Sequence, residues 1–121
     1  MRHSQFDQAM KYFLIITLLS FSYGQLITPN DNAHLNHVHI LFEWEQVPEA
    51  SGYELQISQD PEFSNDLIQV SNNSLVYIER ELIDWESTYF WRVRPVHGQD
   101  LGPWSGAYSF TTGQTLSSSS V

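Results

Sequence analysis

Short stretches of alternating hydrophobic and polar residues recur along the chain between residues 26 and 112. In the longest of them, at 89–94, the odd-numbered positions are Tyr89, Trp91 and Val93, and the even-numbered positions are a phenylalanine and two arginines. A period of two places successive side chains on opposite faces of a β-strand. The pattern therefore predicts a half-buried strand whose odd-numbered side chains face the protein interior.

The same period predicts shorter strands in the rest of this region, separated by turn sequences rich in Pro, Gly, Asn and Ser. It turns Trp44 inward in the stretch 38–45, and Tyr53, Leu55 and Ile57 inward in the stretch 53–58. No window of the sequence has the hydrophobic spacing of an amphipathic helix. About seven short strands with such turns between them predict an all-β antiparallel sandwich. The remaining strands are expected at 26–29, 67–70, 75–78 and 108–112.

Residues 1–24 have a different pattern. The apolar run at 12–21 follows Lys11 and precedes the sequence Ser-Tyr-Gly. A basic residue, a short apolar run and a small-residue end are typical of a secretory signal peptide, so we predict translation from Met10 and cleavage before Gln25. The run is too short to cross a membrane, which needs about 20 apolar residues. The alternative is that the run forms a buried strand or helix.

These boundaries leave residues 25–112 as the predicted domain and residues 113–121 as a Ser-rich tail. The tail is either a linker to further domains or a frayed terminus, and the sequence leaves both open. The whole chain has 5 basic and 14 acidic residues and a formal net charge of −9. This acidity excludes sequence-independent nucleic-acid binding, which relies on basic side chains at phosphates. The absence of cysteine excludes disulfides, zinc–thiolate sites and thiol nucleophiles.

Six short motifs of the predicted domain are similar to those of fibronectin type III domains. They are FEW at 42–44, SGYELQIS at 51–58, DPEF at 60–63, TYFWRVRPV at 88–96, GPWS at 102–105 and SFTT at 109–112. In their order and spacing the chain resembles the variety of this domain found in secreted multi-domain proteins of Bacteroidetes-like bacteria.

The resemblance implies a disulfide-free fibronectin type III sandwich in which three strands pack against four. It also implies a tyrosine corner, in which the hydroxyl of Tyr89, seven residues after Leu82, bonds to backbone near the preceding loop. It implies little about activity, because the fold hosts many unrelated functions. The side chains expected between the two sheets are Trp44, Tyr53, Leu55, Ile57, Leu82, Tyr89, Trp91, Val93 and Phe110.

Histidines are the first candidate metal ligands. His37 and His39, with His34 nearby, share one face of an expected strand, and imidazole binds zinc, copper or nickel. By parity with Trp44 that face points to solvent, and a structural zinc takes four ligands. We therefore favour an exposed polar strand face over a metal site, and we predict no cofactor.

The acidic residues are the second source of candidate chemistry. Asp60, Glu62 and Asp66 could bind calcium, but their spacing does not match an EF-hand loop, and a solvated loop is the favoured interpretation. Paired carboxylates for glycoside hydrolysis need a cleft, for which a sandwich of this size has little room. The sequence has no nucleophile elbow, phosphate-binding Gly-rich loop or HExxH motif. We therefore predict that the protein is not an enzyme.

Exposed aromatic residues are the best candidates for ligand binding. Trp85 with Tyr108 or Trp104 could form a platform for a sugar, because aromatic rings stack on the apolar faces of sugars. The alternative for Trp104 is a stack on Arg92 and Arg94, which face outward on the neighbouring expected strand. The alternative for Trp85 is that it closes one end of the sandwich.

Together these patterns predict a secreted or cell-surface module without catalytic activity. We expect it to act as a spacer or as a protein- or glycan-interaction domain, either by itself or as the N-terminal part of a larger extracellular protein. The second interpretation is a carbohydrate-binding module attached to a polysaccharide-degrading enzyme, and the third is a small metal-dependent protein. The expected partner is an unidentified extracellular protein or glycan, not a nucleic acid. We expect a monomer that has no transmembrane segment after signal cleavage.

Overall fold

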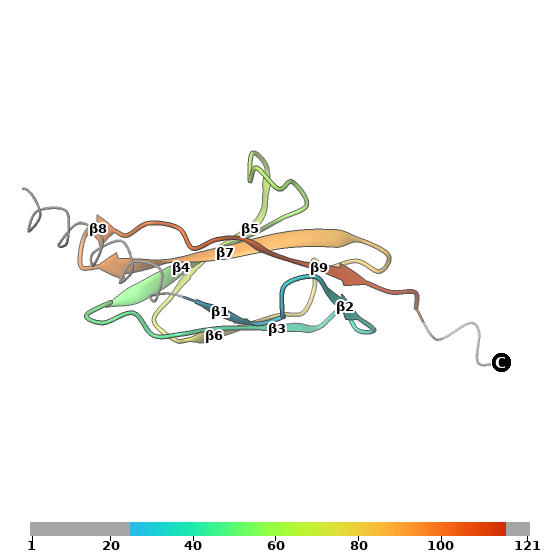
Figure 1. Cartoon of the computed structure of the whole chain (residues 1–121), viewed down its shortest axis with the longest axis horizontal. Coiled ribbons are helices and arrows are strands. Elements are labelled where there is room, and N and C mark those ends of the chain that lie inside the picture. Colours follow the sequence, from blue (N-terminus) through green and yellow to red (C-terminus); the bar gives the residue numbers. More distant parts are fainter. Residues whose placement is uncertain (1–24, 116–121) are drawn as a thin grey trace, which may run out of the picture.

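The computed structural model describes residues 25–115, and all of the regular secondary structure in this range is β-strand (Figure 1). The predicted signal peptide at 1–24 and the tail residues 116–121 lie outside the described residues. Between residues 25 and 115 there is no helix long and apolar enough to cross a membrane.

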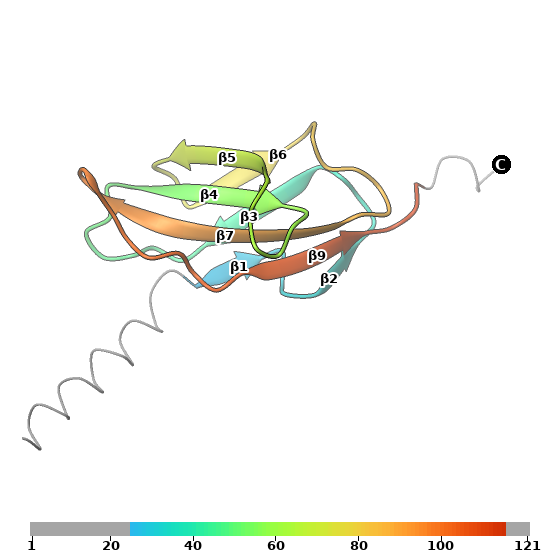
Figure 2. The same ribbon diagram turned by 90° about the horizontal axis from the view of Figure 1, so that it is seen from above.

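Two β-sheets lie face to face and form a sandwich (Figures 1 and 2). The smaller sheet has the strand order β1-β3-β6. The larger sheet has the order β2-β9-β7-β4-β5, and the two-residue strand β8 pairs with the end of β7. The strands are β1 (Leu26–Thr28), β2 (Ala33–Leu35), β3 (Ile40–Trp44), β4 (Gly52–Ser58), β5 (Asp66–Asn72), β6 (Val76–Glu79), β7 (Thr88–His97), β8 (Asp100–Leu101) and β9 (Tyr108–Thr112).

The predicted all-β sandwich is confirmed, with a difference in the larger sheet. The resemblance implied three strands against four, whereas the larger sheet has six strands because β2 and β8 join it. Strand β2 pairs in parallel with β9, and all other strand pairs are antiparallel. Both additional strands are too short to produce a periodic pattern in the sequence.

Alternation along the strands places aromatic side chains in one core between the sheets. Phe42 of the smaller sheet contacts two rings of the larger sheet, those of Trp91 and Phe110, with ring centroids 5.1 and 5.8 Å away. Tyr89 stacks on Phe110 at 5.4 Å. The other expected inward residues except Leu82 are also buried, namely Trp44, Tyr53, Leu55, Ile57 and Val93.

The expectation for Leu82 is wrong by one residue. Its side chain is 50% exposed, whereas that of Ile83 is 4% exposed and belongs to the core. The carboxylate of Glu79 accepts a hydrogen bond from the Leu82 N–H at 2.8 Å, and this bond holds the backbone in a turn after β6. The turn leaves Leu82 at the surface and directs the next side chain inward.

Two buried tyrosines fix loops at the two ends of the sandwich. The backbone N–H of Asp84 donates to the hydroxyl of Tyr89 at 2.8 Å, which is the tyrosine corner that the resemblance implied. The N–H of Val47 donates to the hydroxyl of Tyr53 at 2.9 Å, a contact that the sequence did not indicate. Each bond gives a partner to a backbone N–H that would otherwise be left without one when folding removes its water.

Candidate functional site

The outer face of the larger sheet carries a row of arginine and aromatic side chains. Trp91 and Val93 of β7 point into the core, so Arg92 and Arg94 point outward. The ring of Trp104 lies against both arginines, with its centroid 4.4 Å from the Cζ of Arg92 and 4.3 Å from that of Arg94. The ring of Phe63 lies 4.1 Å from the Cζ of Arg92. We call these four residues, Phe63, Arg92, Trp104 and Arg94, the arginine–aromatic array.

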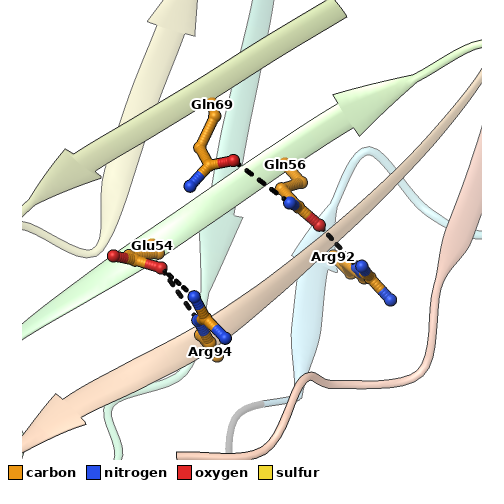
Figure 3. A network of polar contacts seen from close by, with 5 residues as sticks. All are labelled: Glu54, Gln56, Gln69, Arg92 and Arg94. Atoms are coloured by element: carbon orange, nitrogen blue, oxygen red, sulfur yellow. Dashed lines mark hydrogen bonds and ion pairs between the residues drawn. The ribbon is translucent and has the colours of Figure 1, made fainter. Parts of the chain in front are cut away.

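Polar partners on β4 hold both guanidinium groups in place (Figure 3). Arg94 lies opposite Glu54 in the strand register, and the Nε and Nη2 atoms of Arg94 lie 2.8 and 2.6 Å from Glu54 Oε1. Arg92 lies opposite Gln56, whose Oε1 accepts from Nε of Arg92 at 2.8 Å. The amide of Gln56 in turn donates to Gln69 on β5 at 3.2 Å. The two cations are thereby fixed side by side on the sheet surface, ready to receive an aromatic ring.

Two residues of the motif GPWS, Gly102 and Ser105, bring Trp104 onto the array. A Cβ atom at Gly102 would lie 2.6 Å from Cγ of Pro95, so only glycine lets the chain pass this close to β7. The N–H of Ser105 donates to the carbonyl of Val93 at 2.8 Å, and its hydroxyl accepts from the Val93 N–H at 3.1 Å. The segment is thus held along β7 on both sides of the tryptophan.

The loop between β4 and β5 brings Phe63 to the other end of the array. The carboxylate of Asp60 accepts hydrogen bonds from the N–H groups of Glu62 and Ser64, each at 3.0 Å. These bonds, that from Glu62 first, hold the pKa of Asp60 below its ordinary value. Phe63 has a φ of 56°, a left-handed conformation that costs a residue with a side chain about 1–2 kcal/mol. The motif DPEF is therefore a turn that offsets backbone strain with a stacking contact to Arg92.

The three residues expected to form a sugar platform do not come together. Tyr108 has the same parity as Phe110, and its ring meets Trp91 edge-on at 6.2 Å, on the core side of the sheet. Trp104 lies on the opposite side, against Arg92 and Arg94. Trp85 is half-buried in the loop before Thr88, where β7 begins, whereas the segment of Trp104 is hydrogen-bonded to Val93. At about 3.3 Å per residue, roughly 16 Å of strand separates Thr88 from Val93, so the two tryptophans approach β7 at different places along its length.

The histidines and the acidic loop lie apart from any assembled metal site. His37 and His39 are exposed, and Nδ1 of His37 lies 3.3 Å from the side-chain oxygen of Asn36. The carboxylate of Asp60 is already engaged by its own loop. In the part of the chain that the structure describes, no three His, Cys, Asp or Glu side chains are grouped so that they could hold a metal ion.

Glu79 is a buried carboxylate that the sequence analysis missed. Its side chain is 5% exposed, accepts the N–H groups of Glu81 and Leu82 at 2.9 and 2.8 Å, and accepts the hydroxyl of Tyr77 at 2.8 Å. Burial by itself raises the pKa of Glu79, but these hydrogen bonds outweigh it and hold the pKa below its ordinary value. Burial and the same bond to Glu79 raise the pKa of Tyr77 to about 12. The pair closes the turn after β6.

Replacing Trp104 with alanine is expected to lower the free energy of unfolding by about 1–3 kcal/mol, because two cation–π contacts and the cover over β7 are lost. Urea unfolding followed by circular dichroism measures the change. Leu101→Ala is the matched control, because Leu101 is 53% exposed in the same connection and its loss should change stability by less than about 0.5 kcal/mol. Equal stability of the Trp104 variant and the wild type would contradict a structural role for the array.

The comparisons with known proteins agree on the fold. No protein-family model and no curated protein matches the sequence. A human fibronectin type III domain solved in solution matches with a TM-score of 0.58 and 18% identity, over 78% of this chain and 75% of that chain. An Fn3-like protein from Clostridium thermocellum matches with a TM-score of 0.56 and 16% identity, over 70% and 90%.

A larger protein contains a similar domain. The β-1,2-glucanase from Parabacteroides distasonis matches with a TM-score of 0.57 and 16% identity, over 76% of this chain but only 13% of the glucanase. At these identities the likeness concerns the fold alone. The two-sheet order, the corner formed by Tyr89 and these structural neighbours together give the chain the fold of a fibronectin type III domain.

Proposed function

We propose that the protein is a secreted, non-catalytic fibronectin type III module that acts as a spacer or as an interaction domain in a larger extracellular assembly. The arginine–aromatic array is the observation that carries this proposal. Its two arginines are bonded to Glu54 and Gln56, and its tryptophan is stacked on both arginines. The charged and aromatic side chains of the array thus attach the β4–β5 loop and the segment before β9 to the sheet. Contacts with other molecules are then left to the rest of the exposed surface.

Strand edges and surface charge support contact with other macromolecules. Strand β5 ends the larger sheet and β6 ends the smaller one, so each presents backbone groups on one side that could pair with a partner strand. The part of the chain from residue 25 onward has three basic and 13 acidic residues, since the other basic and acidic residues lie in 1–24. Such a surface stays soluble outside the cell and favours partners that are not acidic.

Secretion rests on the pattern at residues 1–24 alone. A basic residue, a ten-residue apolar run and small residues before Gln25 match what the export machinery recognises. The absence of cysteine does not argue against export, because the packed aromatic core supplies stability without a disulfide.

A carbohydrate-binding module is the second candidate function. The observation that favours it is the glucanase neighbour, in which a domain of this fold forms a small part of a glycan-degrading enzyme. Against it stands the ring of Trp104, whose contacts with two guanidinium groups compete with any sugar. Trp85, which makes no ring contact with another described aromatic or cationic group, is then the residue left for stacking on a glycan.

A glycan array with the wild-type protein separates the two functions. A spacer or a protein-interaction module should bind none of the polysaccharides on the array. Retention that is lost in Trp85→Ala at an unchanged melting temperature would replace the first proposal with the second. Trp104→Ala is the companion variant, and its melting temperature has to be reported with its binding because we expect it to be less stable.

A further inference from the structure

The smaller sheet leaves an apolar surface uncovered. Ile27, Leu41, Val76 and Ile78 are 38%, 41%, 41% and 45% exposed, and all four belong to strands β1, β3 and β6. We call these four residues the apolar face. Within residues 25–115 no loop crosses it, whereas the loop of Phe63 and the segment of Trp104 cover the outer side of the larger sheet (Figures 1 and 2).

Strand β6 has its hydrophobic pattern reversed. A sheet with one solvated face normally turns polar residues outward and apolar residues inward. In β6 the β-branched residues Val76 and Ile78 are exposed, while Tyr77 is half-buried and Glu79 is buried. The buried carboxylate needs the hydrogen bonds described above to replace its contacts with water. The strand therefore turns its most hydrophobic side chains toward solvent and its charged side chain toward the interior. An outer face with this composition is characteristic of a contact surface.

The charges around the apolar face are arranged so that the face is complementary to itself. The register pairs Leu41 with Ile78 in the middle and Glu43 with Val76 on one side. On the other side the chain continues to Arg80 and His39, both exposed. The face thus has an acidic end at Glu43, an apolar centre, and a basic end where Arg80 directly follows the last residue of β6. Among the described residues neither Arg80 nor Glu43 has a side-chain hydrogen bond or ion pair that would compete.

We propose that the apolar face binds a second copy of this chain. The two copies are related by a two-fold axis that lies between the two sheets, parallel to their planes, and that crosses the strands at right angles over Leu41 and Ile78. This rotation reverses the strand direction, so Arg80 of each copy comes next to Glu43 of the other. An axis parallel to the strands would instead bring like ends together, which costs free energy. The two sheets would pack about 10 Å apart, with Leu41 and Ile78 of both copies at the centre.

The size of the face sets the strength of the contact. Three short strands cover less than the roughly 800 Å² per partner that stable complexes bury. We therefore expect a weak dimer with a dissociation constant on the order of 0.1–1 mM, populated where the module is concentrated or tethered. The inference departs from the monomer that the sequence led us to expect. It depends neither on secretion nor on the module's other partners, so its failure would leave the proposed function standing.

Sedimentation equilibrium of the purified protein, over about 10 µM to 2 mM, tests the proposal. The mass should rise toward that of a dimer in the wild type, and Ile78→Asp should remain a monomer throughout. Leu101→Asp is the matched control, because Leu101 is 53% exposed on the larger sheet, and it should dimerise like the wild type. A wild type that stays monomeric overturns the proposal, as does a loss of dimer in the control at an unchanged melting temperature.

Charge exchange tests the orientation without removing apolar area. Arg80→Glu should weaken the dimer about five-fold or more, because it places two carboxylates together at both symmetric contacts. Adding Glu43→Arg to that variant should restore the dissociation constant of the wild-type dimer. Circular dichroism verifies that each variant is folded, and Leu41→Asp replaces Ile78→Asp should the latter not fold. A double variant as weak as the single one would overturn the proposed axis.

Discussion

Replacing Phe42 with alanine is expected to destabilise the domain by about 3–5 kcal/mol, the range for removing a fully buried phenylalanine. Phe42 is completely buried and joins the two sheets, because its ring contacts Trp91 and Phe110 of the larger sheet and Tyr77 of its own. Its loss leaves a cavity that the surrounding rings cannot fill without leaving their rotamers. Urea unfolding monitored by tryptophan fluorescence gives the difference, and at such a cost the variant can be largely unfolded at 37 °C.

Leu41→Ala is the matched control, one residue earlier on the same strand. Its side chain is 41% exposed on the outer side of the sheet, so its truncation should change stability by less than about 1 kcal/mol at concentrations where the protein is monomeric. A similar cost for both variants would show that the alternation of β3 is not the one described. That result would contradict the sandwich itself.

Replacing Glu79 with glutamine is expected to lower the free energy of unfolding at pH 7 by about 1.5–3 kcal/mol, because hydrogen bonds to a buried charge are lost or weakened. The carboxylate accepts three hydrogen bonds, from Tyr77, Glu81 and Leu82, and an amide cannot accept all of them without turning its N–H₂ toward a donor. Glu81→Gln is the control, since Glu81 is exposed and joins these hydrogen bonds only through its backbone N–H.

The same carboxylate predicts the direction of the pH dependence. The pKa of Glu79 is lower in the folded protein than in the unfolded chain, so its stabilisation is present above the unfolded value and is lost as the pH falls through the folded value. Tyr77, whose pKa is raised from 10.0 to about 12, contributes stability below pH 10 that is lost as the pH rises through about 12. Between pH 2 and pH 7, the free energy of unfolding should fall less steeply with decreasing pH in Glu79→Gln than in the wild type. Parallel slopes would contradict the role assigned to the carboxylate.

The fold was predictable because its long strands are strongly periodic. Strand β7 alternates from Thr88 to Pro95, and Tyr89, Trp91 and Val93 are buried as the sequence indicates. The error at Leu82 has a physical cause, since a turn held by a side chain, Glu79, decides which of two adjacent hydrophobic residues enters the core. A turn of this kind produces no periodic pattern of hydrophobic residues in the sequence. Strands β2 and β8 were missed for the same reason, because pairing with a neighbour and not pattern defines them.

The candidate site was predictable only where strand parity applies. Parity placed Arg92 and Arg94 outward and so indicated their stack with Trp104. Parity with Phe110 would also have placed Tyr108 inward, a signal that was present and not used. Phe63 was not predictable, because a left-handed turn at a phenylalanine has no sequence signal.

The apolar face was hidden by the ordinary expectation that β-branched residues face the core. In β6 the inward-facing positions are occupied by the half-buried Tyr77 and the buried Glu79, which hydrogen-bond to each other, and Glu79 also bonds to the following turn. Only this local network, which requires the folded turn, reveals that Val76 and Ile78 are at the surface.

The intact mass and the N-terminal sequence of the native protein in the culture medium test whether this chain is an exported module, as we propose. We expect a secreted product that begins at Gln25, either as residues 25–121 or as the first module of a longer chain. A protein that stays inside the cell with residues 1–24 attached would contradict it.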